Sequence, residues 1–298
     1  MVPAAFIDRD LLRRRRFAVV LGAIIVLLAV VETSNALVAP LRTPSDKDWD
    51  AAAAKVRGEF RPGDLIVAAP AWADPLMRLK LGDLVPQAVA GRMDSARYGR
   101  IWEISQRGAR SPDTMDAEVA ATSRFGGLTV RRWERPPATV TFDFLAEWRQ
   151  ASMAVVQAGG VEIPCTQGAD RFQCVGAALG PELLEIDTTL RNGLAVDPVE
   201  GVTLALEFPA VPLGRELTVA AGLHNVWLRK SSDGKVRLRV LADGRELGTV
   251  LATSTGGWSR QGYDTAALAG QTARVRFEIT VDKAHGRHLG FAAEARNP

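Results

Sequence analysis

The chain has 298 residues and a formal net charge of +3, from 37 Lys or Arg and 34 Asp or Glu. Residues 1–16 contain five Arg and two Asp, so this short segment carries the whole excess and the rest of the chain is neutral. The neutral remainder gives no basic face that would argue for nucleic acid, so we predict no nucleic-acid partner. About 255 residues follow the N-terminal apolar segment, enough for two modest domains or a single large one.

Four consecutive arginines, Arg13–Arg16, run directly into the uninterrupted apolar stretch Phe17–Val31. A weaker apolar segment extends this stretch past Glu32, and a helix over residues 17–39 would reach about 34 Å, enough to cross a hydrocarbon core of about 30 Å. Arginine blocks stay on the cytoplasmic side of a membrane. We therefore predict a cytoplasmic basic tail over residues 1–16, and a signal anchor with a single span of the inner (cytoplasmic) membrane. The rest of the chain is then extracytoplasmic, or periplasmic.

The same segment also fits a cleavable signal peptide. It has a basic region, an apolar region and the small residues Ser34-Asn35-Ala36 before a cut. Cleavage would give a secreted form, and both alternatives place the domains in the same compartment.

The two cysteines, Cys165 and Cys174, both belong to the exported part of the chain. An oxidising compartment makes a disulfide the default for such a pair, and so short a loop would contribute about 2–3 kcal/mol in the chain-entropy model. The alternative of free or metal-bound thiols needs further ligands, and the intervening residues supply only Asp170. We expect the disulfide.

Helix and strand patterns alternate after Ser45, which predicts a small α/β domain over residues 45–135 with parallel strand pairing. Ser45-Asp46 can cap the first helix, and Pro62-Gly63 can end it. A short, fully apolar run then reads as a buried parallel strand. The expected helices cover residues 48–60, 74–84 and 113–124, and the expected strands cover residues 65–69, 101–105 and 127–133.

The pattern changes after Pro136-Pro137 to a period of two, which is typical of strands with one buried face. Asp233-Gly234 and Asp243-Gly244 lie between such runs and suit type I′ hairpin turns. We therefore predict an antiparallel jelly-roll β-sandwich over residues 138–298, in an α+β multidomain chain. The alternating runs are residues 139–144, 202–208, 236–240 and 274–281.

This second region resembles the jelly-roll modules of the galactose-binding-like and carbohydrate-binding class. The resemblance covers roughly half the chain, and it implies a fold that hosts many functions, not a particular ligand. The residues that carry it are Asp243-Gly244 with Leu247-Gly248, Gly257-Trp258 with Asp264-Thr265 and Leu268-Ala269-Gly270, and the closing runs Phe277-Glu278-Ile279 and Arg287–Glu294.

The first region is similar to the soluble extracytoplasmic tail of polytopic, lipid-linked-sugar mannosyltransferases. This chain has one apolar span where those enzymes have many, so their membrane-embedded catalytic machinery is absent. The resemblance implies only an association with envelope glycan chemistry. The residues that carry it are Trp49-Asp50-Ala51-Ala52-Ala53, Arg61-Pro62-Gly63-Asp64-Leu65-Ile66-Val67, Tyr98 and Arg100-Ile101-Trp102.

No catalytic motif is present. The sequence lacks the Gly-x-Ser-x-Gly elbow, the Walker loop, the dinucleotide fingerprint and the His-Glu-x-x-His zinc motif. We therefore predict no catalytic residue and no cofactor. His285 and His288 form the only histidine pair, and a turn before a strand gives them no fixed common face, so no metal site is predicted.

One candidate cleft lies at the end of the expected strand 65–69, where α/β domains often bind ligands. Trp72, Asp74, Arg78 and Asp83 would line it. Each carboxylate also has a structural alternative, Asp74 as a helix cap and Asp83 in a helix-ending turn.

Seven tryptophans against two tyrosines favour sugar stacking, because an aromatic face packs on the apolar face of a pyranose. The first glycan-binding candidate is Trp227, with His224, Asn225 and Arg229 as hydrogen-bonding neighbours. The alternative for Trp227 is the sandwich core, the commoner place for tryptophan in a β domain.

Trp258 and Tyr263 form a second aromatic pair, for which the core is again the alternative. From all these features we expect a non-catalytic envelope protein that binds a glycan, or a protein partner in glycan assembly, beside the membrane. One alternative is a hydrolase or transferase with its active site in the α/β domain and the sandwich as targeting module. The other is a structural subunit of a larger membrane complex.

Overall fold

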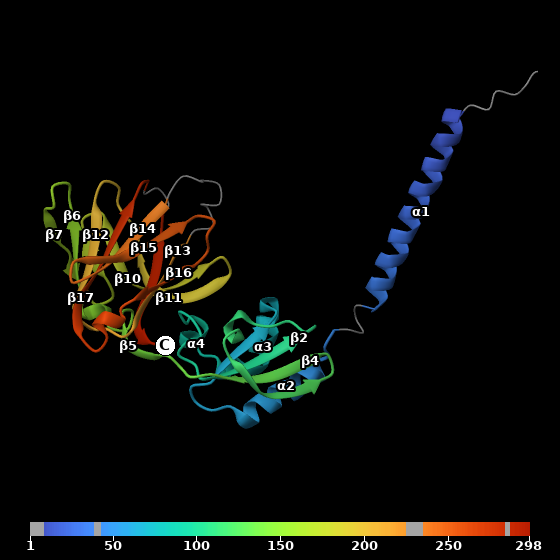
Figure 1. Cartoon of the computed structure of the whole chain (residues 1–298), viewed down its shortest axis with the longest axis horizontal. Helices are drawn as coiled ribbons and strands as arrows, with labels where there is room; N and C mark the ends of the chain where they lie inside the picture. Colours follow the sequence, from blue (N-terminus) through green and yellow to red (C-terminus); the bar gives the residue numbers. More distant parts are fainter. Residues whose placement is uncertain (1–8, 39–42, 225–234, 284–286) are drawn as a thin grey trace, which may run out of the picture.

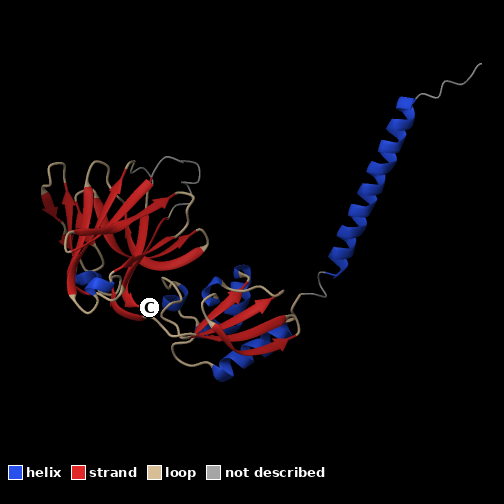
Figure 2. Ribbon diagram, viewed as in Figure 1, coloured by secondary structure: helices blue, strands red, loops and turns tan. Residues whose placement is uncertain are grey.

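The computed structural model describes residues 9–38, 43–224, 235–283 and 287–298. Helix α1 (Arg9–Val38) is the one helix in these ranges that is long and apolar enough to cross a membrane. No part of its apolar window Phe17–Ser34 is buried against the rest of the chain. This exposure fits both the anchor and the signal peptide. Two folded domains follow α1 (Figures 1 and 2).

The first of these, which we call the helix–sheet domain, is a four-stranded mixed sheet of order β1–β2–β4–β3. Strands β1 and β2 are parallel and the other two pairs are antiparallel. Helices α2 and α3 pack together on one face of the sheet. The elements are α2 (Asp46–Glu59), β1 (Leu65–Ala69), α3 (Asp74–Leu81), α4 (Gln87–Ala90), β2 (Arg100–Gln106), β3 (Glu118–Phe125) and β4 (Leu128–Glu134).

Local sequence explains the start of this domain. The Ser45 hydroxyl accepts a hydrogen bond from the Asp48 amide (3.3 Å), and the Asp48 carboxylate accepts one from the Ser45 amide (2.8 Å). This reciprocal capping box starts α2. Strand β1 is buried at all five positions, as its apolar run predicts.

The predicted helix over residues 113–124 is wrong. The structure has a short 3-10 turn, Pro112–Thr114, followed by strand β3. Strand β3 is an edge strand that pairs only with β4, and its side chains are mostly exposed. Pairing with β4 therefore decides its conformation, because tertiary contacts override weak local preferences. The expected parallel pairing is found only between β1 and β2, and the other two pairs are antiparallel.

The second domain, which we call the sandwich domain, packs two antiparallel sheets face to face (Figure 2). The eight-stranded sheet has the order β16–β13–β18–β11–β10–β9–β8, with β5 also paired to β18, and the six-stranded sheet has the order β15–β14–β17–β12–β6–β7. The strands are β5 (Thr139–Asp143), β6 (Ser152–Val156), β7 (Glu162–Pro164), β8 (Thr166–Gln167), β9 (Phe172–Cys174), β10 (Ala177–Ile186), β11 (Thr189–Val196), β12 (Thr203–Pro212), β13 (Glu216–Leu223), β14 (Lys235–Ala242), β15 (Arg245–Thr253), β16 (Ser259–Asp264), β17 (Thr272–Val281) and β18 (Leu289–Asn297).

One apolar core fills the space between these two sheets, and every buried residue in it belongs to the sandwich domain. Phe144 lies at its centre, in edge-to-face contact with Phe142, Phe208 and Phe277. The structure thus confirms the predicted fold class, an α+β multidomain chain with a jelly-roll-like sandwich.

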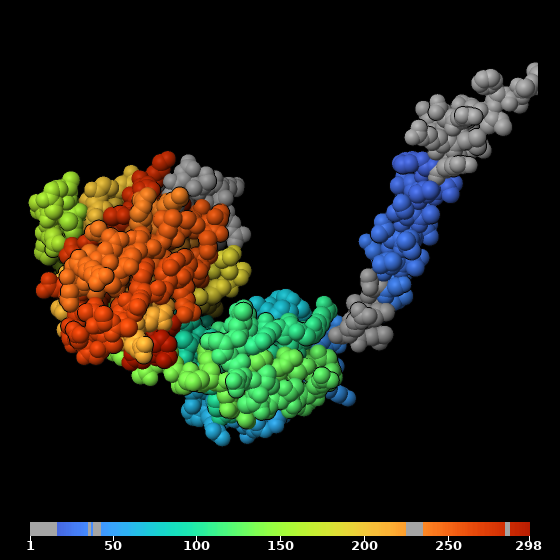
Figure 3. All heavy atoms as spheres, in the orientation of Figure 1, coloured from blue at the N-terminus to red at the C-terminus, as the bar shows by residue number. Residues whose placement is uncertain are grey.

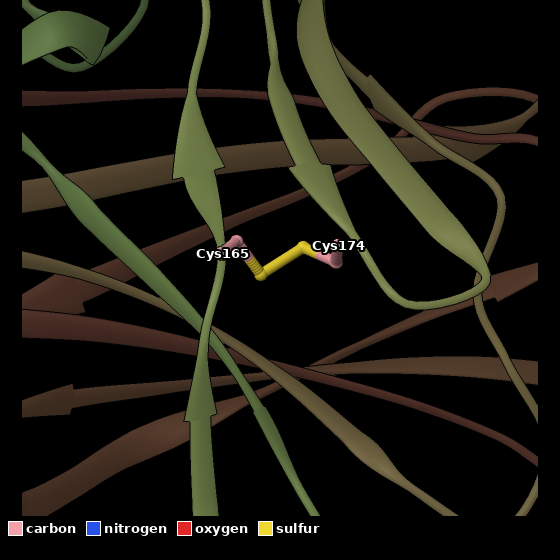
Figure 4. Close-up of a disulfide and its surroundings, with 2 residues drawn as sticks. All are labelled: Cys165 and Cys174. Carbon is pink, nitrogen blue, oxygen red and sulfur yellow. A yellow bond between two sulfur atoms is a disulfide. The ribbon is translucent and has the colours of Figure 1, made fainter.

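Two further predictions in the sandwich domain are confirmed. Asp243 and Gly244 have φ angles of 47° and 78°, as a type I′ turn between β14 and β15 requires. Cys165 and Cys174 form the disulfide, with Cα atoms 4.5 Å apart (Figure 4). The other expected turn, Asp233-Gly234, lies outside the described residues.

Candidate functional site

The outer face of the eight-stranded sheet, opposite the core, carries small and charged side chains. Strands β13 and β18 are neighbours in this sheet, and every second residue of each packs in the core. The residues between them point outwards and leave room for another segment to approach closely. They are Glu216, Thr218, Ala220 and Gly222 on β13, and Gly290, Ala292, Glu294 and Arg296 on β18.

The helix–sheet domain covers part of this face with the segment that follows α4 (Figure 3). The carbonyl of Gly91 accepts a hydrogen bond from the amide of Asn192 on β11 (2.7 Å), and Met93 packs on Ala220 and Ala292. A Cβ on Gly91 would lie 2.5 Å from Nδ2 of Asn192, so a larger residue would displace that side chain. The small outward residues therefore allow the two domains to meet.

A buried ion-pair network lies next to Met93. Arg296 Nη1 donates to Oδ2 of Asp94 (2.7 Å), Arg260 lies 3.2 Å from the same oxygen, and Arg296 Nε is 3.4 Å from Glu216. Burial is the largest single effect on Asp94 and disfavours its charged form. The hydrogen bond and charge of Arg296, together with the Ala96 amide and the charge of Arg260, outweigh this cost and hold the pKa of Asp94 below its ordinary value. Asp94 is thus a charged link between the domains.

Arg97 makes a second ionic contact between the domains. Its Nη2 donates to Oδ2 of Asp143 (3.1 Å) and also to the carboxylate of Glu294. Burial raises the pKa of Glu294, and the nearby charge of Arg97 only partly offsets this effect. Glu294 therefore holds its proton more tightly than an ordinary carboxylate, whereas Asp143 beside it is partly exposed.

A cavity of about 660 Å³ opens beside Arg97, at the junction of the two domains. This volume is in the usual range for small-molecule sites. Both domains and both ends of the sandwich sequence contribute to its wall. The polar residues that line it are Gln87, Arg92, Arg97, Tyr98, Asp143, Glu182, Asn192 and Glu294.

The connection between the domains runs past the same segment. The amide of Arg135 donates to the carbonyl of Gly99 (3.0 Å), and the amide of Ala138 donates to the carbonyl of Ala96 (2.8 Å). Strand β5 begins at Thr139 and joins the eight-stranded sheet at once. The connection is therefore held on the helix–sheet domain up to the first strand of the sandwich.

Trp258 lies on the same outer face, so the alternative of a core position is wrong for this residue. It packs on Ala220, Ala292 and residues of β10 and β11, and its indole N–H donates to the carbonyl of Thr189 (3.1 Å). The guanidinium of Arg191 lies 5.2 Å from its ring centroid, a cation–π arrangement. Tyr263 packs against the core on the other face, so the expected aromatic pair does not form.

The first glycan-binding candidate can be followed only in part. Trp227, Asn225 and Arg229 lie outside the described residues. His224 is half-buried at the end of β13, and its amide donates to the carbonyl of His288 (2.8 Å). His285 also lies outside the described residues. His288 pairs with Asp197 (2.9 Å) and Glu182 (3.4 Å).

The charged residues of the second candidate cleft form two separate ion pairs. Asp74 and Arg78 pair with each other along α3 (2.5 Å), whereas Asp83 pairs with Arg57 on α2 (2.6 Å). Trp72 is 59% exposed, and the cavity between the domains is lined by other residues. The carboxylates thus act as local ion-pair partners.

Sequence reasoning missed Arg97, Asp143 and Glu294. Asp143 and Glu294 lie 46 and 197 positions from Arg97 in the sequence, and only the packing of the two domains brings the three residues together. One signal was available: Glu294 lies in a strand at a position that alternates with apolar core residues. Eight of the nine positions of β18 are buried, which is unusual for a strand that contains Glu294 and Arg296.

No protein-family model matches the sequence, and none of the curated proteins compared matches it. Similar solved structures include carbohydrate-binding modules. The CBM51-2 and INT domains of Clostridium perfringens ZmpB are 14% identical, with a TM-score of 0.31, over 48% of this chain and 31% of that one. The xylan-binding module CBM15 is 10% identical, with a TM-score of 0.27, over 48% of this chain and 90% of that one.

A third similar structure is CBM51 from Clostridium perfringens GH95 in complex with methyl-galactose. It is 8% identical, with a TM-score of 0.26, over 59% of this chain and 94% of that one. The chain spans about a third of the ZmpB structure, 31%. Likenesses this low carry no argument, so the fold rests on the strand order and the site on its own geometry.

Proposed function

We propose that this protein is membrane-anchored and extracytoplasmic, and that it binds a glycan in the interdomain cavity without a catalytic role. The observation that carries the proposal is the wall of the cavity. Groups that donate hydrogen bonds and groups that accept them line one space of about 660 Å³, and Arg92, Arg97, Asp143 and Glu294 are already paired within the protein.

The pairing favours a neutral ligand. Arg97 is held by Asp143 and Glu294, and Arg92 is paired with Asp113 (2.6 Å). A charged ligand would have to displace one of these pairs. An apolar ligand would remove water from N–H groups and lone pairs that it cannot replace, which is costly.

A neutral ligand with many hydroxyls suits this wall, because each hydroxyl both donates and accepts. It can donate to the carboxylate of Asp143 and accept from the guanidinium of Arg97 without breaking the pair. Hydrogen bonds to charged groups are the strong ones. Tyr98 and Asn192 supply a phenol and an amide on the same wall. A neutral sugar of one to a few rings has this chemistry.

Two features support the setting. Helix α1 exposes its whole apolar window, and the arginine block precedes it. A disulfide is typical of an oxidising compartment outside the cytoplasm. The comparisons do not support the similarity to mannosyltransferase tails, so the association with envelope glycan assembly remains part of the proposal. The ion pairs do not support the alternative of an active site in the α/β domain, because Asp74 and Asp83 pair with separate arginines.

The test is a glycan array probed with the full chain in lipid nanodiscs. We expect binding to neutral glycans and a loss of at least about tenfold in Arg97→Gln, since a hydrogen bond to a charged group contributes about 1.5–3 kcal/mol. The matched control is Arg237→Gln, because Arg237 is also paired with a carboxylate, Asp282 (2.6 Å), but lies on the six-stranded sheet. Equal binding by both variants, or no binding by the folded wild type, would refute the proposal and favour the structural-subunit alternative.

A further inference from the structure

The outward face of α3 and the turn before it is apolar at every exposed position. Trp72 is 59% exposed, Leu76 44% and Leu79 75%, and Ala71 and Pro75 are also exposed. The spacings of four and three residues place Trp72, Leu76 and Leu79 on one side of the helix. The inward side, with Met77 and Leu81, already packs on the sheet. We call these five outward residues the α3 stripe.

Surface helices normally present charged and polar residues to water. On α3 the charged residues lie beside the stripe, and each has a partner. Asp74 pairs with Arg78 (2.5 Å), and Lys80 pairs with Asp50 of α2 (2.7 Å). A contiguous exposed apolar face of this kind marks a surface that contacts something other than water.

The length of the segment that connects α1 to α2 limits how far the α3 stripe can lie from the membrane. Residues 39–45 connect the apolar helix to α2, and seven residues span at most about 25 Å. Helix α2 begins at Asp46, and Lys80 is bonded to Asp50, one turn into that helix. The carbonyl of Lys80 also accepts a hydrogen bond from Arg57, about two turns further along α2 (2.7 Å). The last turn of α3, with Leu79, therefore lies beside α2, the first helix after the connection to α1.

We propose that the α3 stripe lies in the headgroup region of the bilayer that holds α1, a role that rests on the anchor in the proposed function. Tryptophan prefers this interface because its ring is apolar and its N–H is polar. Leu76 and Leu79 would enter the adjoining acyl boundary, as the apolar face of an interfacial helix does. The helix–sheet domain is then attached to the membrane at two points, the anchor and the stripe.

A single fluorophore tests the depth of the stripe. Both cysteines form the disulfide, so Leu79→Cys introduces one free thiol that can carry an environment-sensitive nitrobenzoxadiazole label. The full chain is placed in phosphatidylcholine nanodiscs with and without lipids that carry a nitroxide near the headgroup. The matched control is Met115→Cys, because Met115 is also 75% exposed but belongs to the segment that covers the opposite face of the sheet.

We expect a blue-shifted emission and several-fold stronger nitroxide quenching at position 79 than at position 115. Adding Trp72→Ser and Leu76→Ser to the labelled protein should abolish both differences. Equal, weak quenching at the two positions in protein that remains in the nanodisc would overturn the stripe proposal and leave the anchor intact. A blue shift without quenching would also overturn it, because a protein partner or second copy would then cover the stripe. Loss of the protein from the nanodisc would refute the anchor itself.

Discussion

Replacing Asp94 with Asn removes the charge that Arg296 and Arg260 face at 2.7 and 3.2 Å, and it keeps the size of the side chain. Arg296 is only 3% exposed in its side chain. Removal of one partner from a buried ion pair costs about 3–5 kcal/mol, because the other charge stays buried. Glu216 remains 3.4 Å from Arg296, so we expect the lower end of this range, about 3 kcal/mol.

This loss should affect the contact between the domains and not the sandwich core, which contains no buried residue of the helix–sheet domain. Hydrogen–deuterium exchange of the full chain measures the stability of the contact between the domains and that of the sandwich core separately. The amide of Asn192, which donates to Gly91, should exchange about a hundredfold faster, the rate change that about 3 kcal/mol gives. Amides in β12 and β17 should not change. Asp282→Asn, which breaks an exposed pair with Arg237, is the control.

Two results would contradict this reasoning. Unchanged exchange at Asn192 would mean that the charge of Asp94 does not hold the domains together. Equal acceleration in β12 and β17 would mean that the pair stabilises the sandwich itself and that the domains are not separate folding units.

Three further predictions follow from features of the sandwich domain. Because burial raises the pKa of Glu294, this group binds its proton more tightly in the folded state, and its contribution to stability falls as the pH rises from the ordinary carboxyl range. Glu294→Gln should therefore gain melting temperature relative to wild type as the pH rises, and parallel pH curves would contradict this. Replacing Cys165 and Cys174 together with Ser should lower the free energy of unfolding by about 2–3 kcal/mol, measured in denaturant; an unchanged midpoint would argue against the pair. A chain that begins at Pro137 should unfold cooperatively, since it keeps the whole sandwich core, and an insoluble product would show that the domains depend on each other.

The sequence predicted those elements whose local signals agree with their packing. Helix α2 has a capping box, β1 is apolar at every position, and strands β14 and β17 of the sandwich alternate with a period of two. Strand β3 was missed because neither face of it is well buried, so no apolar period could form. Its conformation comes from hydrogen bonds to β4, and a sequence pattern does not record such pairing.

The candidate site was harder to predict than the fold. Arg97 meets Asp143 and Glu294 only because the segment after α4 lies across the eight-stranded sheet, and no short-range pattern reports a contact between domains. The tryptophan count pointed towards ligand binding, but it did not show which ring would be accessible. Trp258 and Tyr263 are five residues apart, an odd spacing, and strand geometry sends them to opposite faces of the sheet.

The contacts at Ala138 and at Gly91 have a mechanical consequence. The first holds the start of the sandwich domain on the helix–sheet domain through Ala96, and the second holds β11 through Asn192. Two separate attachment points resist rotation as well as translation of one domain against the other. A linker with a single attachment point would allow such rotation. The two domains therefore move as one unit. Under the proposed function, a glycan in the cavity between them is held in a fixed orientation relative to both domains.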